Sequence, residues 1–333
     1  MLILNQADVE RLLPMSACID VMAATLSALA RGETVLPLRT IIRLPDESGA
    51  FAVMPGYLGN PKTIGAKVIT VFPGNHGTAY DSHQGAVLLF DSTNGSLSAV
   101  LDATPITATR TAAVSAVATR ALAKDDASTL AIIGAGVQGH AHLEAMCAVR
   151  PIKSLRVVSR DQSHAERLAL AGRERFGLDA VVVPSGEQAV RGADIVCTAT
   201  SSTNPVLFGE WLTPGAHINA VGTSQPTARE IDSATVVRSR LYVDRRESAL
   251  NEPGDLLAPL RAGEIGPEHI VGEIGEVLIG RAPGRGSAAE ITLFKSLGLA
   301  IEDLAAAAYV LCEAERTGAG TRVELGGTRH AAH

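Results

Sequence analysis

Two basic side chains could do chemistry on an anion, because each is the single charge in a long run of small or apolar residues. Lys67 lies within residues 64–72, and Arg110 lies within residues 105–119. Burying a charge is costly unless the charge is paired or used. The planar fork of Arg110 suits a carboxylate, because it can donate to both oxygens. An equally good interpretation of Lys67 is an edge strand whose ammonium faces water. Arg39 is a second candidate clamp, with a plain loop arginine as the alternative.

A glycine pattern predicts a dinucleotide site. Gly134, Gly136 and Gly139 form G-x-G-x-x-G directly after the apolar run 130–133 and at the start of a helical segment. In this context the first glycine permits a tight turn, the second lets the backbone approach a pyrophosphate, and the third lets helix and strand pack closely. The helix N-terminus would favour the phosphates. The alternative is a glycine-rich turn that has lost its ligand.

The turn after the next strand, residues 155–158, bears on the choice between NAD and NADP. Ser159 stands where an NAD enzyme usually has an acid for the ribose diol, and Arg160 follows it. A hydroxyl and a guanidinium suit a 2′-phosphate, which a carboxylate would repel. The pair therefore predicts NADPH, with NADH as a further possibility. In the alternative, Asp161 is the ribose-binding acid and Arg160 is solvated.

The elements that must position these residues fall into two groups. Strand-like runs alternate with helical segments in the β-α-β rhythm of a doubly wound parallel sheet; these runs are 130–133, 155–158, 180–183, 195–198, 217–221 and 241–243. Short strands, an Asn94-Gly95 hairpin signal and helices at 16–29 and 106–123 precede them. The sequence predicts an α/β protein with a Rossmann domain and a smaller α+β catalytic and dimerisation domain. We expect residues 1–120 in the α+β domain, residues 121–304 in the Rossmann domain, and the C-terminal segment 305–325 folded back onto the first.

Composition excludes several other classes. The chain has a formal net charge of −6, which argues against a nucleic-acid binder. No apolar run reaches the roughly 18 residues of a membrane span, and the N-terminal residues lack the basic start of a signal peptide. The four cysteines are widely spaced, so we expect reduced thiols and a cytoplasmic location. We expect no metal site, because His140 and His142 are two residues apart on a helix and point in different directions.

Several motifs together resemble one known family. They occur in order from about residue 1 to residue 313, at 53–57, 66–67, 82–84, 107–113, 134–138, 208–211, 214–222, 273–277 and 294–298. In this respect the chain is similar to the ornithine cyclodeaminase/mu-crystallin family.

The resemblance implies a homodimer with an NAD(P)-binding middle segment. It implies that Arg39, Lys67 and Arg110 hold the carboxylate and the reacting centre of a small substrate. The further residues that we place at the cofactor are Val137, Gln138, Thr111, Thr200, Val221 and Lys295.

Ser224 bears on the reaction. In cyclodeaminase and alanine dehydrogenase members of the family an Asp stands two residues after the glycine that matches Gly222, whereas Ser224 stands here and mu-crystallin-type reductases similarly have Ser. Releasing ammonia needs a base to activate water, while reducing a preformed imine does not. We therefore expect NADPH-dependent reduction of a small imino acid, such as Δ1-pyrroline-2-carboxylate or Δ1-piperideine-2-carboxylate. The alternatives are an ornithine cyclodeaminase, an alanine dehydrogenase-like enzyme, a reductase of an acyclic imine such as iminosuccinate, and a non-catalytic ligand-binding protein.

Overall fold

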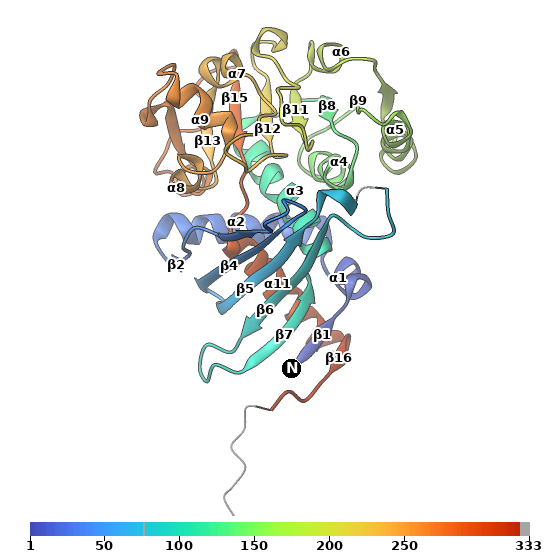
Figure 1. Cartoon of the computed structure of the whole chain (residues 1–333). Coiled ribbons are helices and arrows are strands. Elements are labelled where there is room, and N and C mark those ends of the chain that lie inside the picture. Colours follow the sequence, from blue (N-terminus) through green and yellow to red (C-terminus); the bar gives the residue numbers. More distant parts are fainter. Residues whose placement is uncertain (76, 327–333) are drawn as a thin grey trace, which may run out of the picture. The chain divides into compact units, whose positions relative to one another are not determined.

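The chain divides into two compact units. The computed structural model describes residues 1–75 and 77–326 (Figure 1). One unit consists of Met1–Arg110 and the chain from Leu299 onward, and the other is Thr111–Gly298. The first boundary between the two units therefore falls inside helix α3 (Ala103–Leu122) and not after residue 120 as predicted. The run of small residues continues through this helix without a break. The C-terminal helix of the first unit, α11, spans Ala300–Thr317 and so begins and ends earlier than the predicted segment 305–325.

The first unit is built on one eight-stranded sheet. Its order is β16-β1-β7-β6-β5-β4-β2, and β3 also pairs with β4. The strands are β1 (Leu2–Leu4), β2 (Thr34–Val35), β3 (Thr40–Arg43), β4 (Ala50–Gly59), β5 (Lys62–Val71), β6 (His83–Phe90), β7 (Leu97–Asp102) and β16 (Thr321–Arg322). Helices α1 (Gln6–Leu12) and α2 (Met15–Arg31) complete the unit, and α11 packs on strands β4, β5 and β6 (Figure 1).

Two glycines allow α11 to lie close to the sheet. Gly56 on β4 and Gly65 on β5 are direct cross-strand partners. A Cβ atom at Gly65 would lie 2.9 Å from the Leu304 side chain, and one at Gly56 would lie 3.3 Å from the Ala300 Cβ. Side chains two residues apart on a strand share a face, so Lys67 points to the same side as Gly65 and must meet α11.

The second unit is a doubly wound parallel sheet. Its eight strands have the order β10-β9-β8-β11-β12-β15-β13-β14, and every pairing is parallel. The strands are β8 (Thr129–Ile133), β9 (Ser154–Val158), β10 (Asp179–Val182), β11 (Ile195–Thr198), β12 (His217–Ala220), β13 (Arg240–Val243), β14 (Ile270–Glu273) and β15 (Thr292–Lys295). The part of α3 from Thr111 onward belongs to this unit. The other helices are α4 (Val137–Val149), α5 (Gln162–Phe176), α6 (Gly186–Val190), α7 (Ser233–Arg238), α8 (Arg246–Ala249), α9 (Gly254–Arg261) and α10 (Ile274–Leu278).

The strand order reverses between β8 and β11, which makes the carboxyl ends of these strands the place where such a sheet binds its ligand. The predicted fold class, a Rossmann sheet with a second α+β unit, is confirmed. Strands β14 and β15 were not predicted, because both lie within the Gly-rich stretch between the last predicted strand and the C-terminal helix.

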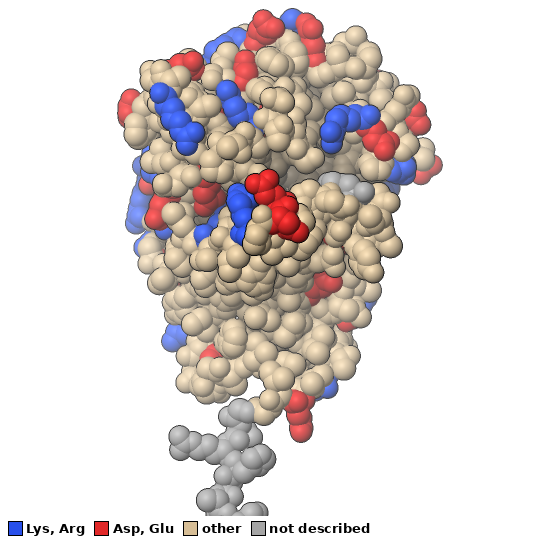
Figure 2. Space-filling model, viewed as in Figure 1, with Lys and Arg blue, Asp and Glu red and all other residues tan. Residues whose placement is uncertain are grey.

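Charged side chains of both signs are interspersed on the face of the molecule shown in Figure 2. Among the described residues, no single helix is both long and apolar enough to cross a membrane; α1 and α2 pass that test only as a pair bent by 82°.

Candidate functional site

Lys67 and Arg110 meet in one buried cluster in the first unit. The Lys67 Nζ atom lies 2.7 Å from Oδ2 of Asp303. Arg110 donates from Nε to Oδ1 of Asp303 and from an Nη atom to Oε2 of Glu302, both at 2.9 Å. Lys67 is 1% exposed and Arg110 is 4% exposed, so water screens these ion pairs little.

The fold explains why four charges gather here. Strand β5 lies between β4 and β6, so Lys67 is not on an edge strand and its water-facing interpretation is wrong. Glu302 and Asp303 lie in the first turn of α11, where the helix dipole favours negative charge. Because the Gly65 position brings α11 close to β5, Asp303 reaches Lys67 directly.

The two acids were missed by the sequence analysis. The signal was present, because Glu302 and Asp303 are adjacent acids directly before the apolar, alanine-rich run 304–312. The desolvation argument that singled out Lys67 applies equally to them.

Burial and neighbouring charges set the protonation behaviour of the cluster. Burial, assisted by the charges of Arg110 and Arg39 and opposed by the charge of Asp303, lowers the pKa of Lys67 to about 8. Burial acts against ionisation of Asp303, but Arg110 and Lys67 together hold its pKa below the usual value. Lys67 is thus a buried amine that can exchange a proton near neutral pH.

The formal charges of the cluster bear on how it could bind a carboxylate. Two cations, Lys67 and Arg110, face two carboxylates, Glu302 and Asp303, so the four groups balance. Arg39 is half-buried and close enough to Lys67 to act on its pKa. The Arg110 fork already serves two carboxylates of the protein, which differs from the expected clamp on a substrate.

The glycine-rich turn in the second unit has the geometry that a pyrophosphate needs. Gly134 has φ +103°, a conformation that a side chain would strain, and a Cβ at this position would collide with the Ala199 carbonyl oxygen. A Cβ at Gly139 would collide with the carbonyl oxygen of Gly134, whereas at Gly136 nothing lies within 4 Å of such an atom. Gly136 is the N-cap of α4, and no side chain caps this helix. These features fit a dinucleotide.

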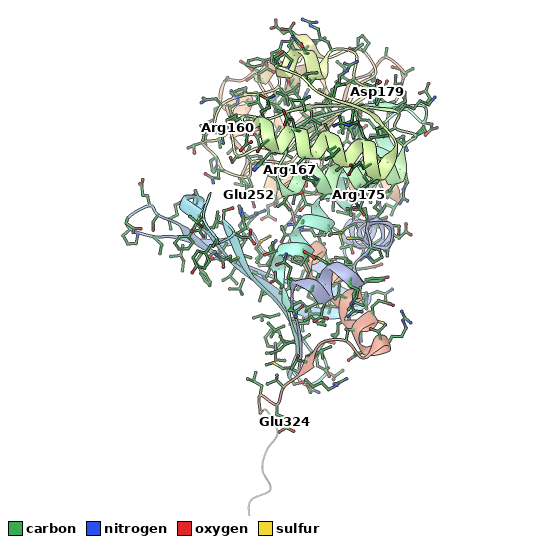
Figure 3. The ribbon with its side chains drawn as sticks, turned by 90° about the vertical axis from the view of Figure 1, so that its right-hand side faces the viewer. Arg160, Arg167, Arg175, Asp179, Glu252 and Glu324 are labelled. Atoms are coloured by element: carbon green, nitrogen blue, oxygen red, sulfur yellow. The ribbon has the colours of Figure 1, made fainter. Side chains whose placement is uncertain are left out.

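The turn predicted to contact the ribose, residues 159–161, follows β9. Ser159 is half-buried and Arg160 is exposed, at the start of α5 in Figure 3, where Arg167 and Arg175 follow along the same helix. Asp161 is the N-cap of α5, and its carboxylate accepts from the backbone N–H of His164 at 3.1 Å and from the Ser163 hydroxyl at 2.7 Å. These hydrogen bonds lower the pKa of Asp161 and occupy one of its oxygens. The helix therefore already uses the acid that was the rival ribose ligand.

Other predicted cofactor and substrate residues lie at the carboxyl ends of the parallel strands. Thr200 follows β11, and Val221 and Ser224 follow β12, with Ser224 half-buried. Val137 and Gln138 form the first turn of α4, where Val137 is 64% exposed, and Thr111 is buried within α3.

Lys295 does not lie where a cofactor contact was expected. It is fully buried at the end of β15, with Nζ 2.9 Å from Oδ2 of Asp255 and 2.7 Å from the Thr223 carbonyl oxygen that it donates to. Lys295 thus holds the backbone of the loop that carries Ser224.

Residues 1–75 and 77–326 include no group of three or more His, Cys, Asp or Glu side chains placed to hold a metal ion. Cys18, Cys147, Cys197 and Cys312 are all free thiols.

Comparison with known proteins gives a consistent result over the whole chain. The profile described as "Ornithine cyclodeaminase/mu-crystallin family" matches residues 1–318. The ketimine reductase mu-crystallin of Mus musculus is 43% identical over 279 residues, which are 84% of this chain and 85% of that protein. A Δ1-pyrroline-2-carboxylate reductase of Bacillus cereus is 36% identical over 326 residues, which are 98% of this chain and 100% of the relative.

A solved structure agrees with these relatives. The structure of Thermococcus litoralis Δ1-pyrroline-2-carboxylate reductase in complex with NADH and L-proline matches with a TM-score of 0.95 and 39% identity, covering 97% of this chain and 100% of that one. The resemblance inferred from the sequence is confirmed, and the chain belongs to the ornithine cyclodeaminase/mu-crystallin family.

Proposed function

We propose that this protein is an NAD(P)H-dependent oxidoreductase that reduces the C=N bond of a small imino acid to give an amino acid. The observation that carries the proposal is the buried Lys67 ammonium, held 2.7 Å from Asp303 and with its pKa lowered to about 8. A group of this kind can hold a proton at an imine nitrogen. The relatives named as ketimine and Δ1-pyrroline-2-carboxylate reductases support the same reaction. The direct test is consumption of NADPH with cyclic imino acids.

The mechanism assigns each side chain of the cluster a separate task. Arg39 and Arg110 hold the substrate carboxylate, and Glu302 and Asp303 fix the guanidinium of Arg110. Lys67 donates a proton to the imine nitrogen and recovers one from solvent. Bound NAD(P)H would supply the hydride for the imine carbon. Fixing the substrate against these groups lowers the barrier by removing much of the cost of orientation.

The loop that follows β12 favours reduction over deamination. It holds Ser224 and, from 222 to 225, no carboxylate. Glu230 is a buried acid that is hydrogen-bonded to this loop. Its two oxygens accept from Thr198, Thr200 and Gly222, so they are not available to activate a water molecule. Attack of water on an imine needs a base, and this loop offers none. We therefore propose a cyclic ketimine such as Δ1-pyrroline-2-carboxylate or Δ1-piperideine-2-carboxylate as the substrate.

The rate of imine reduction is expected to fall as pH rises through about 8. Lys67 must carry its proton to act as the acid, and its pKa is lowered to about 8 by burial. Below this pH the ammonium is charged and kcat/KM is at its plateau; above it the group is neutral. The profile of kcat/KM against pH measures this directly. A flat profile up to pH 10 would remove Lys67 from the proton transfer.

We propose NADPH as the preferred cofactor. Ser159 and Arg160 form the ribose turn, and the carboxylate of Asp161 caps α5. Ser159→Asp should repel a 2′-phosphate and shift the NADPH-to-NADH ratio of kcat/KM toward NADH by about tenfold or more. The matched control is Ser163→Asp, at the second residue of α5. A wild-type enzyme that already prefers NADH would contradict this assignment.

We also propose a homodimer in the cytoplasm. Three apolar side chains on strands β2 and β3, which both pair with β4, are left open to solvent: Val35 (65% exposed), Ile41 (47%) and Ile42 (58%). Exposed apolar side chains on one sheet are typical of an interface. The four free thiols agree with a reducing compartment. A monomer mass in sedimentation equilibrium would contradict the dimer.

A further inference from the structure

One buried carboxylate in the second unit joins the ends of two neighbouring strands. Glu230 is fully buried, and its Oε1 atom accepts from the backbone N–H of Thr200 at 2.6 Å and from the Thr200 hydroxyl at 2.7 Å. Its Oε2 atom accepts from the Thr198 hydroxyl at 2.9 Å and from the backbone N–H of Gly222 at 2.5 Å. Thr198 and Thr200 belong to the end of β11, and Gly222 follows β12. Glu230 therefore ties the two loops together.

Nearby donors and charges oppose the effect of burial on the Glu230 carboxyl group. Burial raises the pKa of Glu230, while Lys295 and the Thr200 donors oppose that effect. Each oxygen of Glu230 accepts from one backbone N–H group, and a backbone N–H group can only donate.

The buried ion pair of Asp255 and Lys295 holds both Glu230 and the loop after β12. Asp255 accepts from the backbone N–H of Glu230 at 2.7 Å and pairs with Lys295. Lys295 in turn donates to the Thr223 carbonyl oxygen. Consecutive residues of the loop, Gly222 and Thr223, are thus both anchored, and Ser224 comes next.

The two loops joined by Glu230 lie at the edge of the sheet where a dinucleotide would bind. Strands β8, β11 and β12 are adjacent, and a Rossmann sheet binds its dinucleotide outside their carboxyl ends. The two loops joined by Glu230 emerge from that edge. A Cβ at Gly222 would collide with the Thr200 carbonyl oxygen and with Glu230, so the loops are as close as a glycine permits.

We propose that Glu230 is a positioning residue that fixes these two loops against each other and so shapes the nicotinamide end of the dinucleotide site. The inference rests on the proposed function only for the nature of the cofactor. Glu230 itself touches neither cofactor nor substrate; it acts through Thr200, Gly222 and the Ser224 loop.

Glu230→Gln tests the proposal with an isosteric change. An amide has one accepting oxygen and one donating nitrogen, so in either orientation its NH2 group faces a backbone N–H, that of Thr200 or that of Gly222. The hydroxyls can turn to accept, but the backbone N–H cannot. One loop must therefore move.

Gly222→Ala is the second variant, because it separates the same loops while leaving the carboxylate in place. Asp194→Asn is the matched control. Asp194 is also a carboxylate that accepts from two backbone N–H groups, those of Ser128 and Thr129, but it lies at the amino end of β8, at the opposite edge of the sheet.

The measurement is NADPH affinity by fluorescence titration in the absence of substrate, beside thermal unfolding and steady-state kinetics. Both Glu230→Gln and Gly222→Ala should raise the Kd for NADPH by about tenfold and lower kcat, with KM for the imino acid changed less than kcat. Asp194→Asn should lower the unfolding temperature but keep the Kd within about twofold of wild type.

An unchanged Kd in a folded Glu230→Gln or Gly222→Ala protein would overturn the proposal, and so would an equal rise in Asp194→Asn. If Glu230→Gln does not fold, Gly222→Ala decides alone. Failure of the proposed function is separable, because a protein that reduces no imino acid but shows the Kd shifts keeps Glu230 as a positioning residue.

Discussion

Lys67→Ala is expected to lower kcat for imine reduction by about 10³-fold while the Kd for NADPH stays within about twofold. The substitution removes the buried proton donor, and Lys67 lies in the first unit whereas the glycine-rich turn lies in the second. Steady-state kinetics and NADPH fluorescence titration measure the two quantities separately.

The control is Lys62→Ala, on the same strand but exposed, which should leave both quantities unchanged. A Lys67→Ala enzyme with more than about a tenth of the wild-type kcat would show that the imine nitrogen obtains its proton elsewhere.

Asp303→Asn is expected to damage both the site and the fold. Asp303 holds Lys67 and Arg110 at once, so its neutral replacement removes the negative charge that these two buried cations share. Removing one partner of a buried ion pair costs about 3–5 kcal/mol of the free energy of unfolding. The charge of Asp303 also raises the pKa of Lys67, so its loss should move the basic limb of the kcat/KM profile below pH 8.

Chemical denaturation and the pH profile of kcat/KM test both parts. Glu313→Gln is the matched control on the same helix, because Glu313 pairs with Arg316 at the surface and such pairs contribute little. An Asp303→Asn protein with wild-type stability and an unmoved basic limb would show that Asp303 does not set the state of Lys67.

The sequence predicted the features that depend on local patterns. The glycine spacing at Gly134, Gly136 and Gly139 predicted a turn that the structure contains, because the constraint is on the backbone itself. Six strands of the parallel sheet lie where apolar runs predicted them, whereas β14 and β15 lie in a Gly-rich stretch in which the sequence analysis predicted no strand. The single charge in an apolar run correctly drew attention to Lys67 and Arg110, both of which are buried.

The remaining features depend on contacts between segments distant in the chain. Arg110 and Glu302 are 192 residues apart, and only the packing of α11 on the sheet brings them together. The role of Glu230 likewise needs the ends of β11 and β12 to be adjacent. In the sequence, Lys295 lies at the end of a strand, as a cofactor ligand would. Only its contacts with Asp255 and with the Thr223 carbonyl oxygen show that it holds the loop after β12.

The reaction itself provides the most direct test of the central claim. NADPH oxidation is measured with Δ1-pyrroline-2-carboxylate and Δ1-piperideine-2-carboxylate, and ammonia release is measured in parallel with ornithine and NAD⁺. Because the loop at 222–225 holds Ser224 and no carboxylate, the account predicts rapid reduction of a cyclic imine and no detectable ammonia from ornithine. Robust ammonia release together with weak imine reduction would contradict it.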